Sequence, residues 1–178
     1  MGKNKSIVYH VVWFVVYVLL QEVLFRNLSL YQSAFCFIYV AFILVLPMDT
    51  PRIFSLFVGF FLGLTIDVFE NTLGIHAAAT TLVAFIRPQV FYLYNTQTSL
   101  SSTTESDNEV SINTLGTRQF VFYAFTIILI HHTAFFLIES FKADLFFRQA
   151  YRILFSTLYT LAVVVIFQFL FYTSSRKR

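Results

Sequence analysis

The chain has 178 residues, of which 58% are hydrophobic and only 12% are charged, with a formal net charge of +3. Soluble globular domains carry about 25% charged residues, so this composition excludes an ordinary soluble domain and indicates a polytopic membrane protein. The single cysteine, Cys36, excludes a disulfide within the chain and is expected to act as a small apolar side chain.

Six apolar stretches, separated by charged or polar residues, predict an all-α membrane protein with about six transmembrane helices. A membrane span needs about 20 predominantly apolar residues, and each stretch reaches or approaches that length. The predicted helices cover about residues 6–25, 30–46, 52–67, 75–94, 119–140 and 150–172. Residues 95–118 are polar and rich in Ser and Thr, which predicts a mobile cytoplasmic linker. We therefore expect one membrane domain over residues 1–178.

The distribution of basic residues predicts that both termini lie in the cytoplasm. In that topology eight Lys and Arg residues are cytoplasmic and four are on the outer side, as the positive-inside rule requires. The cytoplasmic group comprises Lys3, Lys5, Arg52, Arg87, Arg118, Arg176, Lys177 and Arg178. The outer group comprises Arg26, Lys142, Arg148 and Arg152. Arg87 lies in the last turns of its predicted helix, and we expect its side chain to extend to the inner membrane surface.

The third predicted helix carries one stripe of small residues that ends in an acid. Ser55, Gly59, Gly63 and Asp67 are spaced four residues apart and so lie on one face of a helix. Small residues let two helix backbones approach closely. The fourth predicted helix offers a matching face of small residues: Ala77, Thr80, Thr81 and Ala84. The stripe therefore predicts either a tight hairpin between the two helices or a surface that binds a partner.

Three ionisable residues surround the turn between these two helices: Asp67, Glu70 and His76. A straight helix that begins at Arg52 places Asp67 roughly 22 Å further along, near the outer boundary of the hydrocarbon core. Ionisable residues within membrane segments are functional candidates. Three alternatives remain for this cluster: a hydrogen-bonded polar cap on the hairpin, a docking notch for a partner, or a proton or solute site.

The other polar residues of the apolar stretches do not predict catalysis. His131 and His132 point about 100° apart on a helix, so they cannot both bind one metal ion. His132 and Glu139 share a helix face and could pair, but two ligands do not make a metal site, and we expect a structural role. The sequence contains no catalytic or phosphate-binding motif, and its aromatic residues suit lipid-facing and interfacial positions. We therefore expect no enzymatic activity, no cofactor and no nucleic-acid partner.

Two short motifs flank the predicted turn, Gly63-Leu64-Thr65-Ile66-Asp67 and Leu73-Gly74-Ile75-His76-Ala77. In these motifs, in its length and in its early helices, the chain resembles the family of the bacterial rod shape-determining protein MreD. The resemblance implies a non-enzymatic, multi-pass scaffold subunit of the bacterial inner (cytoplasmic) membrane that helps to position peptidoglycan synthesis during cell elongation. It implies MreC as the transmembrane partner, and MreB, RodA and a penicillin-binding transpeptidase as indirect partners. It adds Leu73 and Gly74 to the helix-packing or partner-binding candidates.

That family is also similar in architecture to the substrate-binding subunits of energy-coupling-factor vitamin transporters. The alternative function is therefore a solute-binding membrane subunit, which predicts an outward cavity lined by Asp67, His76 and aromatic residues. Such subunits typically bind their coupling partner through an Ala-x-x-x-Ala pattern on the first helix. Residues 11–20 of the first predicted helix contain no small residue, which counts against transport.

Overall fold

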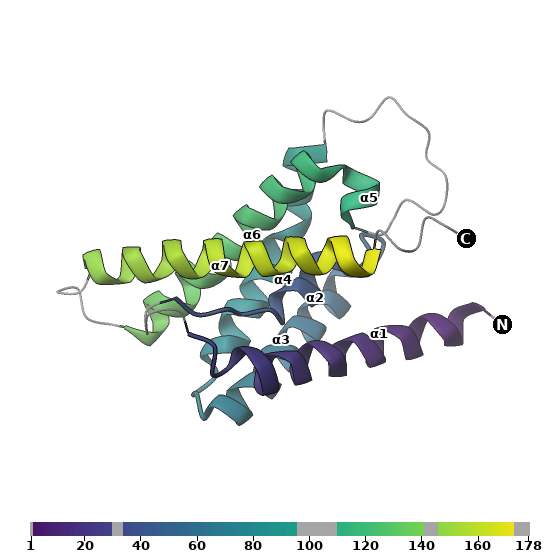
Figure 1. Ribbon diagram of the computed structural model, residues 1–178. Helices are drawn as coiled ribbons and strands as arrows, with labels where there is room; N and C mark the ends of the chain where they lie inside the picture. The colour runs from purple at the N-terminus through teal and green to yellow at the C-terminus, as the bar shows by residue number, and fades with distance from the viewer. Residues whose placement is uncertain (1, 30–33, 96–109, 141–145, 173–178) are drawn as a thin grey trace.

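The computed structural model describes residues 2–29, 34–95, 110–140 and 146–172. This part of the chain is helical and contains no β-strand (Figure 1). The elements are α1 (Gly2–Leu19), the π-helical η1 (Leu20–Phe25), α2 (Val40–Val45), α3 (Arg52–Glu70), α4 (Ile75–Asn95), α5 (Ile112–Leu115), α6 (Thr117–Glu139) and α7 (Phe146–Tyr172). Five of the six predicted helices coincide, to within four residues at each end, with α1–η1, α3, α4, α6 and α7.

Four helical segments in the described ranges are long and apolar enough to cross a membrane. They are Val8–Phe25, Arg52–Glu70, Thr117–Glu139 and Arg148–Phe171. These helices expose many large apolar side chains, such as Phe54 and Phe57 of α3, each of which is 57% exposed. Contiguous exposed apolar surface of this kind suits hydrocarbon rather than water. The fold is therefore that of an all-helical protein with membrane-spanning character.

The helix predicted for residues 30–46 is wrong over most of its length. Only Val40–Val45 forms a helix, α2, whereas residues 34–39 have no regular structure and residues 30–33 lie outside the described ranges. Two hydroxyl groups of α7 replace the missing helical hydrogen bonds. Ser156 Oγ accepts the Phe35 N–H at 2.9 Å, and Thr160 Oγ1 accepts the Phe37 N–H at 3.1 Å. Irregular backbone is stable at membrane depth only where protein groups satisfy it in this way.

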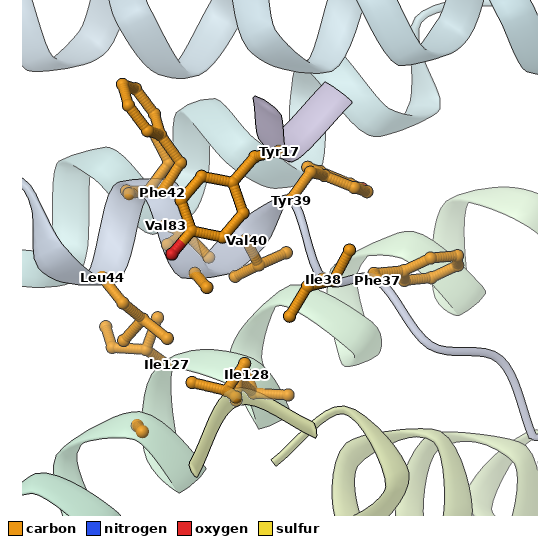
Figure 2. Packing of buried hydrophobic residues seen from close by; sticks show 14 of the residues in the cluster. Tyr17, Phe37, Ile38, Tyr39, Val40, Phe42, Leu44, Val83, Ile127 and Ile128 are labelled. Atoms are coloured by element: carbon orange, nitrogen blue, oxygen red, sulfur yellow. The ribbon is translucent and has the colours of Figure 1, made fainter. Parts of the chain in front are cut away.

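The irregular segment and α2 form the centre of the molecule. Every residue from 38 to 44 is at most 4% exposed. Figure 2 shows Ile38, Val40 and Leu44 of this stretch between Val83 of α4 and Ile127 of α6. A short apolar run that is buried on all sides has the same sequence signature as a transmembrane helix, which explains why the pattern predicted one.

Arg87 joins α4 to the end of α2. We expected its side chain to reach the inner membrane surface, but it is 2% exposed, so that prediction is wrong. Its guanidinium donates to the carbonyl oxygen of Leu46 and, from Nε, to Tyr123 Oη at 3.1 Å. Tyr123 in turn donates to the carbonyl oxygen of Leu44 at 3.1 Å. A cation at the C-terminus of a helix satisfies carbonyl groups and favours the helix dipole, which accounts for the burial of this charge.

α1 and α7 pack side by side in opposite directions. Trp13 of α1 contacts Phe167 and Phe171 near the end of α7, with ring centroids 6.2 and 6.0 Å apart. The start of α1 and the end of α7 consequently lie on the same side of the molecule (Figure 1). The opposite side, where α3 turns into α4, is called the turn end below.

Most of the linker predicted for residues 95–118 lies outside the described ranges, because residues 96–109 are not included. Its last part is ordered. Ser111 caps the short helix α5 by accepting the Thr114 N–H at 3.3 Å, and Val110 and Ile112 are buried. The predicted linker therefore extends too far, because α5 and the start of α6 lie within its last part.

Candidate functional site

The small-residue stripe of α3 closes the helical hairpin. A Cβ added to Gly63 would overlap the Thr80 hydroxyl and the His76 carbonyl, and would lie 2.5 Å from the Ala77 Cα. At Gly59 it would lie 3.0 Å from the Ala84 Cβ and from the Thr80 carbonyl oxygen. Close approach of the two backbones requires glycine at position 63 in particular.

The rest of the predicted hairpin contact follows the same pattern with one exception. Ser55, the first residue of the stripe, is 6% exposed. Three of the four small residues expected on α4 face the stripe, namely Ala77, Thr80 and Ala84. The fourth, Thr81, donates its hydroxyl to the Ala77 carbonyl oxygen at 2.7 Å instead. The hairpin prediction is therefore confirmed for most of its contact.

Asp67 caps the helix that follows it. Its Oδ1 accepts the His76 N–H at 3.0 Å and the Thr72 hydroxyl at 2.5 Å, and its Oδ2 accepts the Ala77 N–H at 2.8 Å. The carboxylate thus satisfies two of the unpaired amide groups at the start of α4 and lies at the positive end of the helix dipole. Of the three alternatives for this cluster, the geometry at Asp67 corresponds to a polar cap on the hairpin.

The turn itself depends on two residues with left-handed backbone. Asn71 has φ 56° and ends α3, and Gly74 has φ +83° immediately before α4. Gly74 meets no heavy atom where a Cβ would be, so its conformation rather than space requires glycine. Leu73 between them is 100% exposed. Nothing in the described hairpin uses the Leu73 side chain, which leaves it free to contact lipid or a partner.

His76 belongs to a buried hydrogen-bonded chain that reaches α6. Its Nδ1 is 2.6 Å from Tyr39 Oη, which is 3.0 Å from His131 Nε2. The other ring nitrogen of His131 is buried without a partner. Because an orphaned N–H is rarer than an orphaned lone pair, we assign the proton to Nε2 of His131. His131 then donates to Tyr39, Tyr39 donates to His76, and the N–H of His76 lies on Nε2, where the structure gives it no partner.

The second histidine of α6 has separate partners. His132 Nδ1 donates to the carbonyl oxygen of Ile128 at 2.8 Å, so its Nε2 accepts from the Thr160 hydroxyl at 3.2 Å. Glu139 forms an ion pair with Arg152 at 3.0 Å rather than a pair with His132. The contact between His132 and Glu139 that their shared helix face allowed therefore does not form. Sequence reasoning missed Tyr39 altogether, because it lies inside the apolar run that was taken for a helix.

A cavity of about 160 Å³ opens at the turn end beside His76. We call it the turn-end cavity. Its polar lining comprises Gln21, Arg26, Glu70, Thr72, His76, Glu139 and Arg152. Four phenylalanine residues add an apolar wall: Phe25, Phe35, Phe37 and Phe135. The described lining contains His76 and aromatic residues, as the transport alternative predicts, but does not contain Asp67.

A second concave surface runs along the outside of the hairpin. This groove, called the α3–α4 groove, encloses about 660 Å³. Its large side chains come from both helices and include Leu56, Phe60, Leu64 and Phe85. Its small residues come from the start of α4: Gly74, Ala77, Ala78 and Thr81. The stripe that faces α4 and the groove that faces outward are thus different surfaces of the same hairpin.

Comparison with protein-family models, with curated proteins and with solved structures finds no match to this chain.

Proposed function

We propose that the chain is a non-catalytic scaffold subunit of the bacterial cell-elongation machinery, of the MreD kind, in the bacterial inner membrane. In this proposal it binds the transmembrane helix of MreC at the α3–α4 groove. Through MreC it acts with MreB, RodA and a penicillin-binding transpeptidase to position peptidoglycan synthesis. The observation that carries the proposal is the groove itself, an apolar concave surface on the outside of the α3–α4 hairpin.

The groove has the features expected of a helix-binding surface in a membrane. Helices associate in lipid through close packing against small residues, and Ala78 and Thr81 are available for such contact because they are not covered by α3. Phe60 and Phe85, which are 43% and 49% exposed, would contact the sides of a bound helix. In this proposal the outer surface of the hairpin binds the partner. Gly59, Gly63 and Asp67 stabilise the hairpin itself.

We further propose six membrane crossings with both termini in the cytoplasm. α4 has 21 residues, about 31 Å at helical rise, and packs between α3 and α6, so it can cross the bilayer although it is less apolar. The irregular segment and α2 would form the remaining crossing, shielded from lipid by the surrounding helices. The start of α1 and the end of α7 lie on the same side of the molecule, as expected for an even number of crossings.

The test is co-purification of MreC with full-length variants after co-expression. Ala78→Phe fills the groove and should reduce MreC recovery by at least about tenfold, the equivalent of about 1.4 kcal/mol. The matched control is Ala162→Phe, because Ala162 is exposed on α7 outside the groove. Equal MreC recovery with both variants would contradict the proposal, provided that each variant elutes as a single species.

The second candidate is a solute-binding membrane subunit, and the turn-end cavity favours it. The first helix argues against a transport role, because no Ala-x-x-x-Ala pattern is present for a coupling partner. A bound ligand at the turn end would also be compatible with a scaffold that senses a small molecule. Co-purification of an energy-coupling ATPase module instead of MreC would favour transport.

A further inference from the structure

The turn-end cavity contains buried polar atoms that the protein does not satisfy. Gln21 lines the cavity and is 2% exposed, yet its Oε1 has no hydrogen-bond partner. Both carboxylate oxygens of the neighbouring Glu22 are also buried without a hydrogen bond. Burial of an unpaired acceptor is costly, and more so for a charged one. These three orphaned oxygen atoms are acceptors, so the group that would satisfy them is a donor.

The charges around the cavity favour a cation as that donor. The cavity is lined by Arg26, Arg152, Glu70 and Glu139, whose charges balance. Arg26 also pairs with Glu22, which lies behind it and does not line the cavity, so this ion-pair network has a formal charge of −1 among the described residues. Arg26 alone is shared between Glu22 and Glu70, at nitrogen–oxygen distances of 3.5 and 3.6 Å. Charge-assisted hydrogen bonds are about 2.7–2.9 Å, so Arg26 holds this position loosely. A smaller cation could approach both carboxylates more closely.

The apolar wall and the size of the cavity limit the rest of the ligand. The rings of Phe37 and Phe135 meet edge to face, with centroids 4.7 Å apart, and both line the cavity. Aromatic faces attract cations, and aromatic rings pack against one another edge to face or offset-stacked. A cavity of about 160 Å³ is close to the size that holds one benzene molecule, about 150 Å³ in an engineered protein core.

We propose that the turn-end cavity binds a small organic cation that consists of an ammonium or amidinium group attached to a single ring. The cationic group donates to Gln21 Oε1 and to the carboxylates of Glu22 and Glu70, in the place that Arg26 occupies without ligand. The ring packs against Phe37 and Phe135. His76 also lines the cavity, and its Nδ1 atom connects the site to Tyr39 and, through Tyr39, to His131 in the core. This site is independent of the α3–α4 groove and does not rest on the scaffold proposal.

The test is a binding titration of the full chain in lipid nanodiscs with three probes of similar size. We expect 2-phenylethylammonium to bind, and neutral 2-phenylethanol and anionic phenylacetate to bind at least about tenfold more weakly, because charged hydrogen bonds contribute about 1.5–3 kcal/mol. Equal affinity for the ammonium and the alcohol, or no binding of the ammonium, would overturn the proposal. Tighter binding of phenylacetate would overturn the assigned charge.

Three variants then locate the site. Gln21→Leu and Glu70→Gln should each weaken ammonium binding about tenfold, whereas Arg26→Gln should strengthen it by removing the competing cation. The matched control is Gln168→Leu, because Gln168 is also buried with an unpartnered amide but does not line the cavity. An equal loss in Gln168→Leu, or weaker binding in Arg26→Gln, would contradict the proposed position. Arg26 is 43% exposed, so that variant tests the site without a core substitution.

Discussion

Asp67 is held at the end of α3 by hydrogen bonds that serve the next helix. Its two oxygens accept three donors, from Thr72, His76 and Ala77, and the residue is 3% exposed. A buried acid whose two oxygens already accept three hydrogen bonds has little capacity left for a solute. The free polar atoms of the turn end belong instead to Gln21, Glu22 and His76, so ligand chemistry and hairpin stability depend on different residues.

The sequence predicts the packing of the hairpin but not the hydrogen bonds of Tyr39, and the reason is physical. Gly63 and Asp67 lie four residues apart on one helix, so their shared face follows from helical periodicity alone. Tyr39, in contrast, is 37 residues from His76 and 92 from His131, its two hydrogen-bond partners. No local pattern relates such residues, because only tertiary packing brings them together.

Gly63 and Gly59 should differ sharply in their tolerance of alanine. Gly63→Ala places a Cβ against α4 backbone, and such overpacking typically costs about 1–3 kcal/mol. Gly59→Ala meets contacts at 3.0 Å, and its gain in helix propensity of about 1 kcal/mol offsets part of the strain. The free energy of unfolding in mixed detergent micelles should therefore fall by more for Gly63→Ala. Equal losses would show that the hairpin relaxes at both positions.

At the scale of the elements, the stretch before α2 is the one that departs from its sequence pattern. Residues 34–46 are as apolar as a transmembrane helix, but they fill the centre of the molecule and do not form a lipid-facing surface. Helix α7 makes this possible because Ser156, Thr157 and Thr160 place hydroxyl groups on its buried face. The polar residues of α7 were the available signal, since a lipid-facing helix has no use for three buried hydroxyls.

Removal of the Thr160 hydroxyl should destabilise the protein, whereas removal of the Thr157 hydroxyl should not. Thr160→Val leaves the Phe37 N–H and His132 Nε2 without partners, at a cost of about 1–3 kcal/mol. The Thr157 hydroxyl is buried and has no partner, so Thr157→Val should be neutral or stabilising. Thermal unfolding of both variants in detergent checks this. A larger loss for Thr157→Val would contradict the role given to Thr160.

At the scale of the whole molecule, the α3–α4 hairpin contributes to three different surfaces. The inward face of α3–α4 packs on itself, the turn end contains the charged cavity, and the outward face forms an apolar groove. An all-helical protein with membrane-spanning character was predictable from composition, and four helices among the described residues are long and apolar enough to cross a membrane. The turn-end cavity was not predictable in its lining, because it combines residues of several elements whose relative positions the sequence does not specify. The α3–α4 groove belongs to the predicted hairpin, but its concave shape depends on side-chain packing that periodicity does not specify.

The central claim is that a partner's transmembrane helix occupies the α3–α4 groove, and site-specific photo-crosslinking in membranes tests it most directly. A photoreactive amino acid replaces Ala78 in the groove or Ala162 on α7 in otherwise unchanged chains co-expressed with MreC. The account predicts a covalent adduct with the MreC transmembrane segment from position 78 and none from position 162. An adduct from position 162 alone, or none from either position in cells where MreC still co-purifies, would contradict it.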